Sequence, residues 1–432
     1  MFKYILQQYY NLSKMTSILS RISKSKFFRG SVLTVSASFL GSFINYLLNR
    51  NIGKAFSIED YGEYSSALSY LVIISVPLMA QSMIIIRRIG MSKNRTEMAC
   101  KINYYLKSRV RIHFLKLVVI SAFLIATMIF FGKIKLSSSI FVIALTYLAI
   151  FSTMYLSILN GYQRFDKAAF YSAATNLIKF VICSITILII NKLYGLYISL
   201  FLIVFLVNIQ IRKSVLPDCS YKKNHFKFKP LKHYLLSKEL LIPFIANLGM
   251  LGLLNTDMIL VKKFFPGNDS GLYAGLSLFA KIVFYVCGPI ASIAYTFYTR
   301  KGKTQKKRIL MLASSITIFF GIGALVSYTV FPKLVISIIF NSKYASLAPF
   351  LWLSAIFGAF YSLMNIMSQF LIAKNSKWVG VSVVAGVLQF IIISIYHPSF
   401  YSAMIVNSII AIITFLVFLS IVLIDLRRDA NV

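Results

Sequence analysis

The chain alternates long apolar segments with short segments that are rich in polar and basic residues. Each apolar segment holds roughly the 20 residues that an α-helix needs to span the bilayer core. The pattern predicts twelve membrane-spanning helices, at residues 31–51, 61–86, 112–132, 137–160, 168–190, 194–211, 240–262, 271–298, 309–331, 346–371, 378–396 and 400–424. Because the connections are short, we expect an all-α integral membrane protein of about twelve transmembrane helices, without a separate soluble domain.

The composition supports a membrane protein. Of the 432 residues, 58% are hydrophobic and 13% are charged, and the mean hydropathy is +0.78. Such a chain has too few polar groups to cover a water-soluble surface. The net charge of +35 would suggest nucleic-acid binding in a soluble protein,. Here the basic residues collect between the apolar segments, so we expect contact with membrane lipids and no nucleic-acid partner.

The loop charges predict an orientation. With twelve spans, the loops of one side carry 35 lysines and arginines, the loops of the other side carry 9, and 2 lie within spans. Cytoplasmic loops of membrane proteins are enriched in both residues. We therefore expect both termini in the cytoplasm, with the first and seventh spans each leading into an outer loop.

A short internal repeat divides the chain into two halves. Residues 59–65 (EDYGEYS) resemble residues 268–274 (NDSGLYA), 209 positions later, although a chance match of Asp-x-Gly-x-Tyr is the alternative. Six spans separate the copies, so the halves share one orientation and we expect two six-helix bundles related by a pseudo-two-fold axis along the membrane normal. The predicted division is a basic cytoplasmic N-terminus (1–30), an N-terminal bundle (31–211), a basic cytoplasmic linker (212–239), a C-terminal bundle (240–424) and a cytoplasmic tail (425–432).

Several motifs together resemble one family of transporters. They are 45–47 (NYL) with 59–64 (EDYGEY), 159–165 (LNGYQRF), 255–257 (NTD) with 271–273 (GLY), and 339–344 (IFNSKY) before 348–349 (AP). In this order and at these spans, the chain resembles the polysaccharide flippases of the multidrug/oligosaccharidyl-lipid/polysaccharide exporter superfamily, specifically the O-antigen repeat-unit translocases. Each motif alone is weak, and the specificity comes from their order and spacing.

The resemblance implies a function. Such a protein holds a laterally accessible cavity between two helix bundles, and the cavity opens alternately to cytoplasm and periplasm. The implied cargo is an oligosaccharide repeat unit on undecaprenyl pyrophosphate, carried across the bacterial inner membrane for O-antigen or other surface polysaccharide biosynthesis. A polysaccharide polymerase and a chain-length regulator are the candidate protein partners. The resemblance implies a transporter and not an enzyme.

Two lysines lie deep within predicted spans. Lys179 is about eleven residues into the fifth span and Lys281 about ten into the eighth, so both fall near the bilayer midplane,. A charge at that depth is costly and usually faces a bundle interior or a wet cavity. On a cavity wall the two ammonium groups would offset the cost of bringing a pyrophosphate into a low dielectric. The alternative is that each lysine pairs structurally or snorkels.

One carboxylate also lies within a span. Asp257 is roughly eight residues before the outer end of the seventh span, at a depth similar to that of Lys281 in the next span. We therefore predict that Asp257 and Lys281 can form an ion pair. The pair would either rearrange as a gate between inward and outward states or simply neutralise two buried charges.

Arginines and amides complete the candidate substrate site. Arg50 lies at the outer end of the first span, and Arg87 and Arg88 lie at the inner end of the second, where guanidinium groups could bind phosphate or simply anchor the helices,. Asn45 and Asn255, in the paired hairpins of the two halves, could face sugar hydroxyls or join helices by hydrogen bonds,. The cysteines and histidines form no metal-ligating pattern, so we expect no metal, no cofactor and no catalytic residue,.

Two other functions fit a polytopic membrane protein. A membrane polysaccharide polymerase or glycosyltransferase would need acid/base groups on a substantial outer loop, whereas the longest predicted outer loop, about 332–345, has no acidic residue. A drug or cation exporter of the same superfamily would favour carboxylates within spans. This chain has one such carboxylate, Asp257, against two midplane lysines. The sign of the buried charge therefore favours an anionic cargo.

Overall fold

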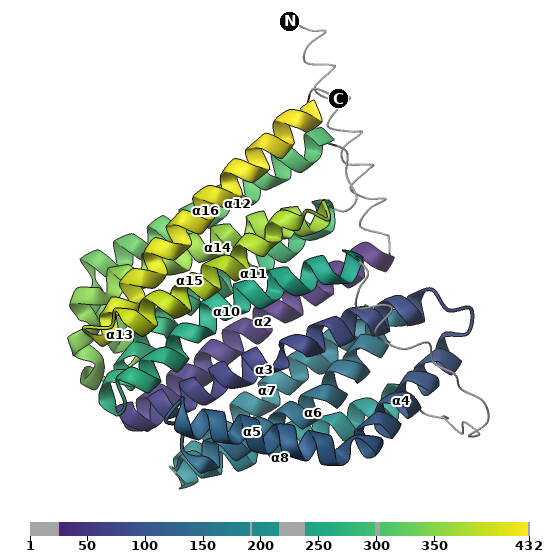
Figure 1. Ribbon diagram of the computed structural model, residues 1–432, viewed down its shortest axis with the longest axis horizontal. Coiled ribbons are helices and arrows are strands. Elements are labelled where there is room, and N and C mark those ends of the chain that lie inside the picture. Colours follow the sequence, from purple (N-terminus) through teal and green to yellow (C-terminus); the bar gives the residue numbers. More distant parts are fainter. Residues whose placement is uncertain (1–25, 191, 216–237, 299–302, 431–432) are drawn as a thin grey trace, which may run out of the picture.

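The protein is built from helices. The computed structural model describes residues 26–190, 192–215, 238–298 and 303–430, and within these ranges every regular element is helical (Figure 1). The α-helices are α2 (Lys26–Ala55), α3 (Ile58–Gly90), α4 (Arg95–Ile112), α5 (Phe114–Phe130), α6 (Leu136–Gly161), α7 (Phe165–Ile190), α8 (Leu193–Val215), α10 (Lys238–Phe264), α11 (Asn268–Tyr298), α12 (Lys303–Val330), α13 (Pro332–Ile339), α14 (Leu351–Ala373), α15 (Val381–Ile395) and α16 (Phe400–Ala430). Two 3₁₀ segments, η1 (Ser342–Phe350) and η2 (Lys377–Gly380), lead into α14 and α15.

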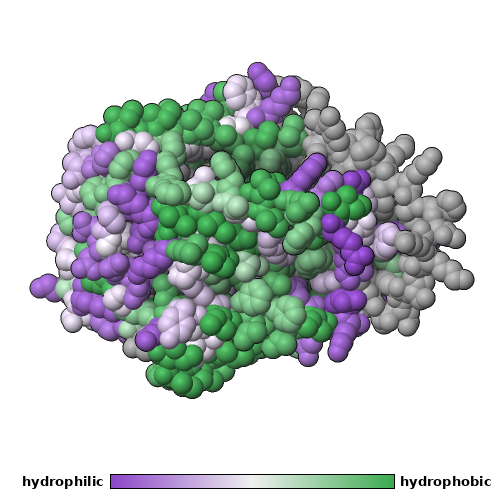
Figure 2. All heavy atoms as spheres, turned by 60° about the horizontal axis from the view of Figure 1, so that its bottom comes forward, coloured by the Kyte–Doolittle hydropathy of each residue, from purple (hydrophilic) through white to green (hydrophobic). Residues whose placement is uncertain are grey.

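The helices agree with the predicted spans. In the described part of the chain, 10 helices are long and apolar enough to cross a membrane, and the pair α4–α5, bent by 70°, raises the number to 11. The 30-residue helix α2 contains the remaining predicted span, 31–51. The all-α membrane fold is therefore confirmed. The space-filling view shows the corresponding surface, with apolar side chains between two polar ends (Figure 2).

The two halves repeat one packing pattern. In the first half, α3 packs on α6, α2 packs on α7, and α6 and α7 both pack on α8. In the second half, α11 packs on α14, α10 on α15, and α14 and α15 on α16, which is the same pattern six spans later. The halves meet mainly where α2 and α3 contact α10 and α11, at the centre of Figure 1. Of the predicted domain boundaries, most of 1–30 and 212–239 and the last two residues of 425–432 lie outside the described residues.

The glycine of the sequence repeat lies where the backbones of α3 and α11 approach each other closely. A Cβ added to Gly62 would lie 2.6 Å from the backbone nitrogen of Gly271, and a Cβ added to Gly271 would overlap the carbonyl of Ile58. Only residues without a side chain allow α3 and α11 to approach so closely. The sequence repeat thus marks the point where the equivalent helices of the two halves cross. We call this end of the molecule, with the α2–α3 and α10–α11 turns, the hairpin face, and the opposite end the terminal face.

Candidate functional site

A cavity of about 370 Å³ lies between the two halves. Its walls come from α2, α3, α6, α7 and α8 of the first half and from α10 and α11 of the second. The wall is mostly apolar, as is usual for ligand sites, with a small number of polar groups. The polar side chains are those of Asn45, Asn49, Ser65, Ser69, Lys179, Asn255, Ser277 and Lys281, with the hydroxyls of Tyr61, Tyr64 and Tyr285.

The two midplane lysines line this one cavity from different halves. Lys179 projects from α7 and Lys281 from α11, and both side chains are only partly buried. The cavity has no carboxylate among its lining residues, all of which the structure describes. The site is therefore a mostly apolar chamber with one basic side chain from each half, which suits an anionic group,.

The two predicted asparagines line the same cavity, one from each half. Asn45 is exposed and lies with Asn49, whose Nδ2 donates to the Asn45 carbonyl at 2.8 Å. Asn255 is buried, and its Nδ2 donates to the Leu251 carbonyl at 2.9 Å. The geometry thus brings together four of the predicted substrate residues, namely Lys179, Lys281, Asn45 and Asn255.

The three predicted arginines do not line the cavity. Arg50 lies at the hairpin face, where its Nε donates to the Ile338 carbonyl of the other half at 2.9 Å. Arg87 and Arg88 lie in the last turn of α3, at the terminal face, and Arg87 is exposed. Their expected contact with cargo remains a prediction for the mouth of the cavity.

The hairpin face is closed by contacts between the halves. Asn341 Nδ2 donates to the Lys54 carbonyl at 3.0 Å, and Lys343 Nζ donates to the carbonyls of Lys54, at 3.2 Å, and Phe56. The Tyr61 ring packs edge-on against Phe340, with centroids 5.6 Å apart. The longest predicted outer loop, about 332–345, is thus helix α13 and the start of η1, folded against α2 as a cover.

A buried ion pair joins the halves beside this cover. Glu63 of α3 and Lys262 of α10 approach to 3.1 Å, and both side chains are buried. The other Glu63 oxygen accepts a hydrogen bond from the backbone nitrogen of Lys135 at 2.8 Å. The sequence does not predict this pair, because its pattern places Glu63 in the loop motif and Lys262 among the outer-loop charges. One feature of the sequence could have indicated it. Glu63 lies one helical turn after Glu59 and Asp60, which is the spacing of residues on one face of a helix and not of a loop.

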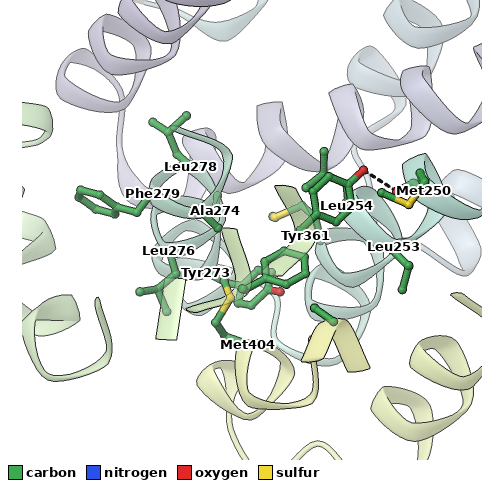
Figure 3. Packing of buried hydrophobic residues seen from close by; sticks show 14 of the residues in the cluster. Met250, Leu253, Leu254, Tyr273, Ala274, Leu276, Leu278, Phe279, Tyr361 and Met404 are labelled. Atoms are coloured by element: carbon green, nitrogen blue, oxygen red, sulfur yellow. Dashed lines mark hydrogen bonds between the residues drawn. The ribbon is translucent and has the colours of Figure 1, made fainter. Parts of the chain in front are cut away.

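Asp257 lies in a sealed network within the second half. Its Oδ2 accepts hydrogen bonds from the Tyr273 hydroxyl at 2.5 Å and from Asn407 Nδ2 at 2.7 Å, and its Oδ1 accepts one from the Met258 backbone nitrogen at 2.7 Å. Gln389 Nε2 in turn donates to Asn407 Oδ1 at 2.7 Å. All four side chains in this network are buried. Figure 3 shows how Tyr273 and the nearby Tyr361, which donates to the Met250 carbonyl at 2.8 Å, lie among packed apolar side chains.

The predicted pair of Asp257 with Lys281 does not form in this conformation. Both residues are described, and the carboxylate is held instead by Tyr273, Asn407 and the Met258 amide. These donors already satisfy both oxygens of Asp257, while Lys281 lines the cavity and lies near enough to the carboxylate for an electrostatic attraction without direct contact,. A pair in another conformation remains a prediction.

The fold is shared with known membrane transporters. No family model and no curated protein matches the sequence. Among solved structures, the lipid II flippase MurJ in an inward closed conformation is 16% identical, with a TM-score of 0.69 over 93% of this chain and 90% of that one. An inward-facing MATE multidrug transporter of the MOP superfamily is 13% identical, with a TM-score of 0.65 over 92% of this chain and 99% of that one. An outward-facing MATE transporter, 11% identical over 95% of this chain and 98% of that one, gives a TM-score of 0.59.

Proposed function

We propose that this chain is a flippase that carries undecaprenyl-pyrophosphate-linked oligosaccharide repeat units across the bacterial inner membrane by alternating access, for O-antigen or other surface polysaccharide biosynthesis. One observation carries the proposal. Lys179 and Lys281, from opposite halves, line one cavity that has no carboxylate on its walls. Transporters of the same fold include a lipid II flippase, which supports a lipid-linked cargo.

The charges suit a pyrophosphate in particular. A diphosphate entering a chamber of low dielectric loses its hydration, and opposed ammonium groups replace part of that stabilisation. Because the two lysines belong to different halves, the anion would bridge the halves and be held by both. Movement of one half against the other would then change the distance between the lysines and so the affinity for the anion.

The closed hairpin face supports a loading state. By the positive-inside rule this face is periplasmic and the terminal face is cytoplasmic, so cargo would enter from the side of the terminal face. Arg87 and Arg88 would meet the pyrophosphate there, and Arg50 would meet it on release, after its bond to the Ile338 carbonyl has broken,. Opening toward the periplasm requires separation of Glu63 and Lys262.

A drug or cation exporter is the second candidate. The MATE transporters among the similar structures and the buried carboxylate Asp257 favour it. Against it, Asp257 does not line the cavity, and the charged side chains that do are cationic. A membrane polymerase would need a catalytic group that the cavity lining does not offer, so we propose a transporter and not an enzyme.

Flipping in proteoliposomes tests the proposal. The purified full chain would be reconstituted with fluorescent undecaprenyl pyrophosphate carrying an oligosaccharide, and flipping would be measured by protection from a membrane-impermeant quencher. Lys179→Gln and Lys281→Gln each remove one charge-assisted contact, which is typically worth about 1.5–3 kcal/mol. We expect each variant to weaken cargo binding about 10- to 100-fold.

A matched lysine provides the control. Lys333 is exposed on α13 and lies outside the cavity, so Lys333→Gln should leave binding and flipping unchanged. Equal activity of Lys179→Gln, Lys281→Gln and the parent chain would contradict the proposed anion site. Transport of a cationic dye by the parent chain, without movement of the lipid-linked sugar, would favour the exporter.

A further inference from the structure

A second cavity, of about 190 Å³, lies inside the first half. It is bounded by α6, α7 and α8, and we call it the N-half pocket. Its polar lining is Ser152, Ser172, Thr175, Asn176 and Lys179, and its apolar lining is Leu156, Val204, Val207 and Ile211. Lys179 also lines the central cavity, so this lysine belongs to the walls of both spaces.

The N-half pocket offers hydrogen-bonding groups that the protein does not use. The side chains of Ser172 and Asn176 form no hydrogen bond with any described residue of the chain. Thr175 donates to the Tyr171 carbonyl at 2.6 Å and keeps its acceptor lone pairs,. Groups of this kind are normally satisfied within a membrane protein, where water is scarce. Their free donors and acceptors therefore point to a polar ligand.

Packing of α2 leaves room for one of these groups. Gly41 of α2 faces Asn176, and a Cβ at this position would lie 2.6 Å from Asn176 Nδ2. The glycine thus allows the amide to occupy the space between α7 and α2. A larger residue at position 41 would displace the Asn176 amide without removing any hydrogen-bonding group from the pocket.

The second half repeats part of this arrangement. Gly249 of α10 faces Ser382 of α15, as Gly41 of α2 faces Asn176 of α7. Ser382 Oγ donates to the Val379 carbonyl at 2.7 Å, whereas the Asn176 side chain has no hydrogen-bond partner among the described residues. The polar group opposite the glycine is therefore used within the second half and remains available in the first.

We propose that the N-half pocket binds the first sugar ring of the cargo, next to the phosphate that Lys179 contacts. The inference rests on the proposed function and adds to it a subsite for the sugar. The pocket is smaller than the roughly 300–1,000 Å³ of typical ligand sites, so it suits a single ring and not an oligosaccharide. Hydroxyl and amide groups beside an ammonium group match a ring of hydroxyls attached to a phosphate.

Two lipids test the proposal in the full chain, purified in nanodiscs. Binding of bare undecaprenyl pyrophosphate would be compared with binding of undecaprenyl pyrophosphate that carries one N-acetylglucosamine. Two or three neutral hydrogen bonds, each worth about 0.5–1.5 kcal/mol, predict about tenfold tighter binding of the sugar-bearing lipid. Leucine is close to asparagine in volume. In Asn176→Leu the affinity for the sugar-bearing lipid should therefore exceed that for the bare lipid by a factor of only about 1 to 3, and the affinity for the bare lipid should be unchanged.

Further variants separate the subsite from folding and from the phosphate site. Thr175→Val should slightly reduce the ratio of the two affinities. Thr329→Val is the matched control, because exposed Thr329 donates the same kind of hydrogen bond to the Leu325 carbonyl at 2.8 Å. It lies outside the pocket and should leave the ratio unchanged. Gly41→Ala should reduce the ratio by displacing the Asn176 amide. Lys179→Gln should weaken both lipids.

The outcomes distinguish the two proposals. A ratio near one in the parent chain, or an unchanged ratio in both Asn176→Leu and Gly41→Ala, would overturn the sugar subsite and leave the anion site standing. Bare lipid binding that does not depend on Lys179 and Lys281 would overturn the proposed function and the subsite with it. Loss of sugar-dependent binding alone, in Asn176→Leu and Gly41→Ala, is the expected result.

Discussion

The two halves share a helix arrangement and differ in where they hold polar groups. The first half has a pocket that shares Lys179 with the central cavity and contains amide and hydroxyl groups without a hydrogen-bond partner among the described residues. The second half has a buried carboxylate, and each of its oxygens accepts a hydrogen bond from a neighbouring donor. At the spacing of 209, Asp257, Gln389 and Asn407 correspond to Leu48, Phe180 and Ile198.

This difference separates two uses of a polar residue inside a membrane protein. A network whose side chains hydrogen-bond to one another across helices fixes the packing of the helices that contribute to it. A group without a protein partner adds nothing to that packing and remains available for a ligand. The second half therefore has the character of a rigid frame, and the first half that of a binding surface.

The largest effect is expected where the halves meet. Glu63→Gln leaves Lys262 as a buried charge without its partner, and removal of one member of a buried pair typically costs about 3–5 kcal/mol,. We expect the hairpin face to open in this variant. The measurement is the disulfide yield between cysteines introduced at Arg50 and Ile338, which are joined by a hydrogen bond in the closed state.

The charge swap provides the control for this pair. Glu63→Lys combined with Lys262→Glu restores opposite charges across the same interface and should recover part of the cross-linking yield. The carboxylate would then lie on α10, away from the Lys135 backbone nitrogen, so recovery should be incomplete. A yield in Glu63→Gln equal to that of the parent chain would show that the aromatic cover alone closes this face.

A smaller effect is expected from making the second half resemble the first. Asp257→Leu introduces the residue found at the equivalent position 48 and leaves the Tyr273 hydroxyl and the Asn407 amide without their acceptor. Each unsatisfied buried group costs about 1–3 kcal/mol, so the free energy of unfolding should fall by about 2–5 kcal/mol. The readout is the melting temperature in detergent, which should fall by several degrees.

The conservative variant at the same position sharpens this prediction. Asp257→Asn keeps one carbonyl oxygen that can accept from Tyr273 and Asn407, so it should lose less stability than Asp257→Leu. If the two variants melt alike, the network contributes packing and not hydrogen bonding. Unchanged stability in Asp257→Leu would contradict the rigid-frame interpretation of the second half.

The sequence predicted the helices and the cavity lysines better than the contacts between halves. Span positions follow from hydropathy and bilayer thickness, both of which are local properties of the chain. Lys179 and Lys281 could be assigned to an interior because a charge near the midplane has few other places to go. The Asp257 network could not be predicted, because its partners Tyr273 and Asn407 lie 16 and 150 positions away and depend on how four helices pack.

The Glu63–Lys262 pair shows a second limit. Both residues lie near predicted span ends, where a charge is ordinarily solvated, yet the packing of α3 against α10 beside the Lys135 backbone leaves both side chains buried,. The loop-charge count could assign a side of the membrane to Lys262. It could not show that this lysine faces a carboxylate in the other half.

The smallest expected effect compares two asparagines of the first half. Asn208 accepts a hydrogen bond from the Ser152 hydroxyl at 2.8 Å and donates to the Leu148 carbonyl at 3.3 Å, whereas Asn176 has no partner among the described residues. Asn208→Leu should therefore lower the free energy of unfolding by about 1–2 kcal/mol. Asn176→Leu should change it by less than about 0.5 kcal/mol, measured as a melting temperature in the absence of lipid-linked sugar. Equal destabilisation by both substitutions would mean that Asn176 supports the fold, and the contrast between a satisfied frame and an available binding surface would then not extend to this pocket.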